Sequence, residues 1–297
     1  MSLIVGAYPA QPAERQEQFH HGLAGIPSIR GLELPYGPYG GTGWPAGAAD
    51  GWSAMVTAIP GTMQRLDTNG TFGLASADPQ GRREALEFVA GVRAYAHQLR
   101  DEGHEVEAVE LHSAPTGSAS AHWFQESLKE VLEWDWGTAR ILIEHCDAPR
   151  PGSTPEKGFL AFAEEVDTAV ALRGQGWEQV GVSVNWGRSV IESGNPDTAV
   201  QHLALGREAG VLAGLMFSGC SPEETGFGYP WIDAHLPAVE VDGAPPSSLL
   251  NGREIERCLE AAGPVPILGF KVGLGPQEIT PAERVDRFRQ MSSLLGG

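Results

Sequence analysis

The chain lacks the features that define several large classes of protein. It has no run of about 18 consecutive apolar residues, so no membrane-spanning helix is expected. Its opening, MSLIVGAYPA, has neither the basic start nor the apolar core of a secretory signal peptide. Three cysteines without C-x-x-C spacing indicate neither a disulfide framework nor a zinc ribbon. We therefore expect a soluble protein of the reducing cytoplasm.

Basic residues are also scarce, with 20 Lys and Arg against 38 Asp and Glu and a net charge of -18. An acidic surface favours solubility and repels the phosphate backbone of nucleic acids. No Walker motif occurs, and no G-x-G-x-x-G follows the first apolar run. The sequence therefore argues against nucleic acid and membrane as partners.

What the sequence does contain is an alternation of apolar runs and amphipathic stretches. We expect strands at 3–9, 29–35, 54–60, 106–113, 141–145, 180–186, 212–218 and 267–273. Helices are expected at 82–103, 120–134, 158–173, 197–209, 252–262 and 281–295. The stretch 35–52 is too rich in Gly and Pro for a helix. Eight strands separated by helices predict an α/β fold, a single (β/α)₈ TIM barrel spanning 1–297.

The ends of these strands carry ionisable side chains, as in RILIEHCDAP at 140–149. Side chains of barrel strands alternate between the interior and the helices, and active sites lie at the C-terminal ends of the strands. This alternation brings one set to a common rim: Tyr8, Glu33, His112, Glu144, Asn185, Ser218 and Lys271. Glu110 lies one layer deeper than His112, and His145 faces the helices.

Several short sequence segments resemble those of a known family. They are VELH (109–112), SADPQGRREAL (76–86), IEHCDAP (143–149), and WIDAHLP (231–237) followed by SLLNGREIERCLEAAG (248–263). Together they resemble the xylose-isomerase-like TIM barrels, a superfamily of sugar and sugar-phosphate isomerases and epimerases. The opening MSLIVGAYPA resembles a bacterial subgroup known only as a domain of unknown function.

The resemblance implies a metal ligand at Glu144 but also an altered metal site. Where the family usually offers Asp or His, His, and Glu on strands six to eight, this chain has Asn185, Ser218 and Lys271. A lysine ammonium repels a divalent ion. We therefore expect either no cofactor or a divalent metal (Mn, Zn, Mg or Co). A rebuilt metal site would use Glu144, His112, Asp233 and His235.

Four rim residues are candidates for chemistry. Glu144 and Glu33 form a carboxylate pair for proton transfer, although Glu33 could instead bond loop amides. Lys271 could stabilise an enolate, form a Schiff base, or replace the metal as a fixed charge paired with either glutamate. His112 could steady the enolate oxygen, or be a buried imidazole that Glu110 orients.

Further residues are candidates for substrate binding. Arg188 could hold a carboxylate or phosphate, or form a surface salt bridge. The loop 218–237 carries Phe227, Tyr229 and Trp231 between glycines, as a hinged lid would. Its aromatics, with Trp44 and Trp123, could contact a sugar or only pack the loop. The predicted substrate-binding set is Tyr8, Asn185, Arg188, Trp186, Trp231, Asp233 and His235.

These observations favour an isomerase or epimerase of carbohydrate metabolism, acting on a sugar, keto-sugar or polyol by proton transfer next to a carbonyl. A homodimer is compatible with such a barrel. Two alternatives stay open. One is a carbohydrate-binding barrel without chemistry, and the other is a glycoside hydrolase or lyase that uses Glu110 and Glu144.

Overall fold

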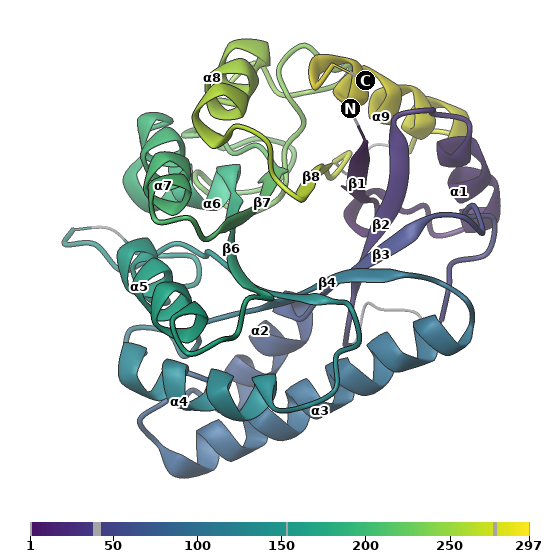
Figure 1. Cartoon of the computed structure of the whole chain (residues 1–297). Helices are drawn as coiled ribbons and strands as arrows, with labels where there is room; N and C mark the ends of the chain where they lie inside the picture. Colours follow the sequence, from purple (N-terminus) through teal and green to yellow (C-terminus); the bar gives the residue numbers. More distant parts are fainter. Residues whose placement is uncertain (1, 38–42, 153, 276–277, 297) are drawn as a thin grey trace.

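The computed structural model describes residues 2–37, 43–152, 154–275 and 278–296. Parallel strands form a closed barrel in the order β1 to β8, and β8 pairs back onto β1. The strands are β1 (Leu3–Gly6), β2 (Ile29–Pro35), β3 (Ser53–Thr57), β4 (Val106–Leu111), β5 (Arg140–Glu144), β6 (Val180–Asn185), β7 (Leu212–Phe217) and β8 (Ile267–Lys271). Helices surround the barrel (Figure 1). The predicted (β/α)₈ fold is confirmed.

The helices agree with most of the expected ranges. They are α1 (Gln16–Ala24), α2 (Ile59–Thr68), α3 (Pro79–Asp101), α4 (Ala121–Leu132), α5 (Phe162–Arg173), α6 (Trp186–Ser193), α7 (Asp197–Glu208), α8 (Gly252–Ala262) and α9 (Pro281–Leu294). Helices α1, α2 and α6 were not predicted, and α2 and α6 begin inside the apolar runs expected as strands at 54–60 and 180–186. In the stretch 35–52 the described residues form no helix, as expected, while 38–42 lie outside the described residues.

Polar side chains fix the starts of several helices. Asn251 accepts a hydrogen bond from the backbone N–H of Glu254 at the start of α8. Thr280 and Glu283 form a capping box at the start of α9. Such caps satisfy backbone donors that have no partner within the helix. Both helices begin where the expected ranges 252–262 and 281–295 begin.

The barrel interior is apolar at its base and polar above. One buried cluster inside the barrel comprises Ile4, Met55, Ala108, Leu142, Ala213, Met216 and Ile267. Burial of such side chains stabilises each by about 1.5–3 kcal/mol. The charged residues at the strand ends therefore lie directly above this apolar cluster. Within the described ranges, no helix is both long enough and apolar enough to cross a membrane.

Candidate functional site

Lys271, at the end of β8, forms an ion pair with Glu33 of β2, across β1, the strand that lies between them. Its Nζ donates to Glu33 Oε1 at 2.5 Å and to the hydroxyl of Tyr8 at 3.3 Å. The three residues are neighbours because β1, which precedes Tyr8, pairs with both β2 and β8. The side chains of Lys271 and Glu33 have no exposed surface. The buried ammonium is therefore paired, as a buried charge requires.

Glu144, at the end of β5, lies among cations. Its Oε2 is 2.6 Å from Arg188 Nη1 and 2.7 Å from His112 Nε2. Its Oε1 is 3.9 Å from Lys271 Nζ and accepts a long hydrogen bond of 3.5 Å from Asn185 Nδ2. Both oxygens of this carboxylate are thus engaged by the protein itself.

A second anion, Asp233, continues the network from the loop after β7. Its Oδ2 is 3.0 Å from both Arg188 Nε and Lys157 Nζ, and its Oδ1 is 3.3 Å from His235 Nδ1. The Oγ of Ser218 lies 3.0 Å from the same imidazole nitrogen. Arg188 therefore bridges Glu144 and Asp233. Sequence reasoning missed Lys157, because alternation along strands says nothing about loops, although only three lysines occur in the chain.

The two rim glutamates have different electrostatic environments. Burial raises the pKa of Glu33, and the nearby Lys271 lowers it only in part. Burial would also raise the pKa of Glu144, but the charges of Arg188 and Lys271 outweigh it and hold that pKa well below its usual range. Two carboxylates whose pKa values are pushed apart suit different roles. Of the two, Glu33 is the carboxyl group whose pKa lies above its usual value.

Glu110 lies one layer below the rim, as the alternation predicts. Neither oxygen of its buried carboxyl group has a hydrogen-bond partner among the described residues. Burial raises its pKa well above the usual range, and the charges of Glu144 and Glu33 raise it further. This shift favours the protonated, neutral form of the carboxyl group, which forms no hydrogen bond with His112.

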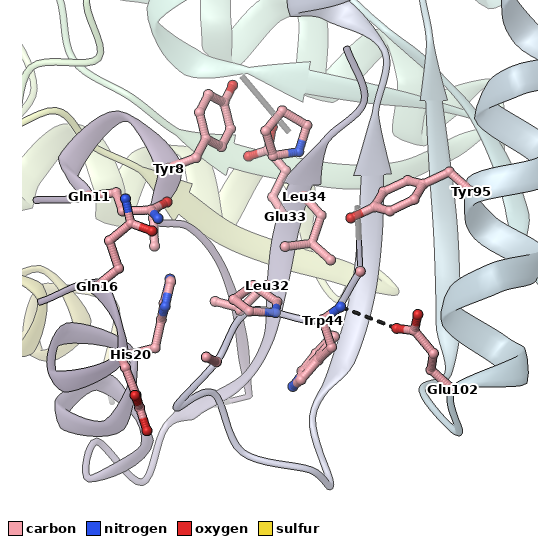
Figure 2. Close-up of a pocket in the computed structure, with 16 residues that line it drawn as sticks. Tyr8, Gln11, Gln16, His20, Leu32, Glu33, Leu34, Trp44, Tyr95 and Glu102 are labelled. Atoms are coloured by element: carbon pink, nitrogen blue, oxygen red, sulfur yellow. Dashed lines mark hydrogen bonds between the residues drawn. The ribbon is translucent and has the colours of Figure 1, made fainter. Parts of the chain in front are cut away.

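A cavity of about 660 Å³ opens beside the ends of β1 and β2. Figure 2 shows Tyr8, Glu33 and Trp44 on its wall. The backbone N–H of Trp44 donates a hydrogen bond to Glu102 Oε2 at 3.2 Å. Gln11, Gln16 and His20 also line the cavity. The last two lie on α1, which the sequence did not predict, so their position was missed.

Several predicted residues lie elsewhere. Trp186 is fully buried in the apolar layer between strands and helices. Trp231 and Tyr229 line a second cavity of about 920 Å³, which Arg150 and Glu192 also border. Trp123 stacks beneath the guanidinium of Arg82. The structure thus joins the charged rim residues in one network but does not bring these aromatics to it.

The donor set at the barrel centre does not fit a divalent ion. Glu144 is neutralised by Arg188 and Lys271, and Arg188 separates it from Asp233 and His235. Among the described residues, the one group of three or more potential ligands with atoms within 4.8 Å of one another is His145, Glu192 and His202. That group lies outside the barrel. The central cations stand where the resemblance implies a metal.

The closed barrel has the fold of solved structures named as xylose isomerases and sugar epimerases. A protein from Rhodospirillum rubrum that is provisionally named a xylose isomerase superposes with a TM-score of 0.65 at 12% identity, covering 100% of this chain and 98% of the other. D-psicose 3-epimerase from Clostridium cellulolyticum gives a TM-score of 0.55 at 15% identity, covering 99% and 92%. At such identities the likeness concerns the fold.

Within this class the chain belongs to the family described as Domain of unknown function (DUF4862), whose model matches residues 4–287. The uncharacterized protein STM3670 of Salmonella typhimurium is 33% identical over 278 residues, which cover 88% of this chain and 85% of that protein. The expected subgroup, a domain of unknown function, is confirmed, and the fold is that of the expected superfamily.

Proposed function

We propose that this protein is a sugar isomerase that moves a proton beside the carbonyl of a keto-sugar or related polyol. Glu33 transfers the proton, and Lys271 supplies the positive charge that a metal supplies elsewhere. The observation that carries this proposal is the contact of Lys271 with Glu33, a residue that lines a cavity large enough for a monosaccharide.

Glu33 is suited to acid–base work for two reasons. One carboxylate oxygen accepts from Lys271, whereas the other, Oε2, has no hydrogen-bond partner among the described residues. Its raised pKa brings it closer to neutral pH, where a general base is most effective. Glu144, with both oxygens engaged and a depressed pKa, is better suited to hold the cations in place.

Lys271 is suited to stabilise the negative oxygen of an enolate. Burial lowers its pKa, but the charges of Glu33, Tyr8 and Glu144 outweigh burial, so the pKa lies well above its usual range. A fixed ammonium in a buried site is a strong electrostatic stabiliser. A Schiff base requires a neutral amine, so this chemistry is not favoured.

A single base on one face of the substrate favours isomerisation over epimerisation. Glu33 can remove a proton from one carbon and return it to the neighbouring carbon on the same face, which interconverts an aldose and a ketose. Inversion at one carbon needs a second group on the opposite face. Glu144 is poorly suited to that role because its carboxylate is already paired with Arg188 and His112.

Exchange of substrate protons with solvent tests the proposal. D-psicose and D-tagatose, which occur in the name of a structural neighbour, serve as first probes in D₂O followed by proton NMR. We expect the wild type to exchange a proton beside the carbonyl and Glu33→Gln to lose exchange by at least about 100-fold. Glu17→Gln, an exposed carboxylate of the same cavity, is the control. Full exchange by Glu33→Gln refutes the assignment.

Binding without chemistry is the second candidate function. The complete burial of Lys271, Glu144 and Asn185 favours it, because a substrate must open the site to reach them. Tight binding of a sugar in calorimetry, with no exchange of any bound sugar, would establish this alternative. Glycosidic hydrolysis by Glu110 and Glu144 is not proposed, since neither residue lines the cavity and both oxygens of Glu144 are engaged by neighbouring side chains.

A further inference from the structure

A second polar cluster surrounds His145 on the helix-facing side of β5. The two ring nitrogens contact different carboxylates, with Nδ1 at 2.7 Å from Glu165 Oε2 and Nε2 at 3.1 Å from Glu192 Oε2. The other oxygen of Glu192 lies 3.9 Å from His202 Nε2. His145 directly follows β5, the other residues come from α5, α6 and α7, and none of them takes part in the rim network.

The cluster has the spacing of a metal site with three ligands. His145, Glu192 and His202 each offer one ligand atom, and these atoms lie within 4.8 Å of one another. Zinc binds imidazole nitrogen and carboxylate oxygen at about 2.0–2.2 Å in tetrahedral sites, which sets ligand atoms roughly 3.3 Å apart. Small side-chain movements therefore suffice to close these three atoms around an ion.

The surroundings hold both imidazoles in the orientation that metal binding requires. Glu165 lies against Nδ1 of His145, and its other oxygen accepts from Ser113 Oγ at 2.6 Å. The Nδ1 of His202 is 3.0 Å from Ser189 Oγ. Each Nε2 thus faces Glu192 while the opposite nitrogen is held by a neighbour. Metal-ligating histidines almost always have such a partner on the second nitrogen.

The cluster is closed on one side and accessible on the other. The ring of Phe162 stacks on His202 and meets His145 edge-on, at centroid distances of 4.6 and 5.0 Å. Glu192 borders the 920 Å³ cavity that Arg150 also lines. An ion can enter from this cavity if the half-exposed Arg150, 3.4 Å from Glu192, moves aside.

We propose that His145 Nε2, His202 Nε2 and the carboxylate of Glu192 bind a divalent transition-metal ion of the zinc type, with one coordination position open to the cavity. Imidazole and carboxylate ligands suit Zn²⁺ and Co²⁺. The ion joins β5, α6 and α7, so its binding stabilises the folded chain. The site is independent of the pair formed by Glu33 and Lys271.

Titration of the chelator-treated full chain with Co²⁺ tests the site through its visible absorption spectrum. We expect one Co²⁺ per chain with the bands of a four-coordinate ion, displaced by Zn²⁺. His202→Gln should lose these bands, and Ser189→Ala should weaken binding by roughly 10-fold. His122→Gln, which removes an exposed histidine of α4, and Glu33→Gln should bind as the wild type does.

Thermal unfolding provides a second readout that does not depend on the spectrum. Zn²⁺ should raise the unfolding midpoint of the wild type and of His122→Gln, but not that of Glu192→Gln. Absence of binding to the wild type overturns the proposal. So does equal Co²⁺ binding by His202→Gln, or equal Zn²⁺ stabilisation of Glu192→Gln. Loss of binding in Glu33→Gln instead would place the ion in the barrel.

Discussion

The ammonium of Lys271 on β8 donates to the carboxylate of Glu33 on β2 at 2.5 Å, across β1, which pairs with both strands. The same ammonium lies 3.9 Å from Glu144, the position that the family resemblance assigns to a metal ligand. A protein cation therefore stands beside the residue for which the resemblance implies a metal ligand. The barrel has a carboxylate and an ammonium group in contact, which is the basis of the proposed proton transfer.

Removal of the buried ammonium should destabilise the fold strongly. We expect Lys271→Met to lower the free energy of unfolding by about 3–5 kcal/mol at pH 8, because Glu33 and Glu144 are left as buried charges without this partner. The loss should be smaller at pH 5, where Glu33, with its raised pKa, can take up a proton. Urea unfolding at both pH values measures the difference.

Lys129→Met is the matched control for that variant. Lys129 pairs with Glu126 on the exposed face of α4. Exposed pairs contribute about 0–1 kcal/mol, so the control should unfold almost as the wild type does. Equal effects of the two substitutions would contradict a structural charge at Lys271.

Replacement of Glu110 by glutamine should stabilise the protein as the pH rises. The folded-state pKa of Glu110 is raised well above the usual value of about 4.3, so the unfolded state loses this proton first. The free energy of unfolding of the wild type therefore falls as the pH rises from about 4.3 to the pKa of Glu110 in the folded state. The total fall is about 1.4 kcal/mol for each unit by which the two pKa values differ. Glu110→Gln avoids this loss. Urea unfolding between pH 4 and pH 8 should show the two proteins diverging, whereas a less stable variant at pH 8 would mean that Glu110 is ionised and paired.

The rate of proton exchange should fall at acidic pH with a raised midpoint. Glu33 must be ionised to remove a proton, and its pKa lies above the usual value of about 4.3. The acid limb should therefore lie above pH 4.3. Lys271 should add no alkaline limb below about pH 10, since its pKa is raised. Initial exchange rates from pH 4 to pH 10 measure both limbs, with unfolding followed at each pH, and a rate unchanged down to pH 4.3 would count against Glu33.

One methyl group beside the pair should disturb it. A Cβ added at Gly6 would lie 2.5 Å from Glu33 Oε2 and 2.8 Å from Lys271 Cγ. Gly6→Ala should therefore displace the pair, cost about 1–3 kcal/mol and lower exchange. Gly51→Ala, whose added atom meets nothing within 4 Å, is the control and should stay within about 0.5 kcal/mol. A Gly6→Ala protein that exchanges substrate protons at the wild-type rate would show that the contact between Glu33 and Lys271 is not needed for exchange.

The barrel could be predicted from the sequence because each buried parallel strand is a short apolar run that ends in polar residues. The alternation of side chains also placed Lys271, Glu33 and Glu144 together correctly, since strand geometry fixes which face a side chain takes. It placed His145 towards the helices for the same reason.

The rest depends on contacts that strand alternation does not encode. Lys157 reaches Asp233 from a loop, and Trp231 turns to a second cavity from a backbone with positive φ. Arg188 follows β6 as expected, yet it lies inside on α6 between two carboxylates instead of at the surface. Such positions follow from loop conformation and charge pairing across the chain.

The most direct test of metal-free proton transfer is solvent-deuterium exchange into a ketohexose by chelator-treated protein, with the chelator present throughout. Since the proposal assigns to Lys271 the charge that a metal would supply, we predict that the wild type exchanges at the rate of untreated protein and that Glu33→Gln does not exchange. Exchange that disappears in the chelator and returns only with a divalent ion would contradict the central role of Glu33 and Lys271.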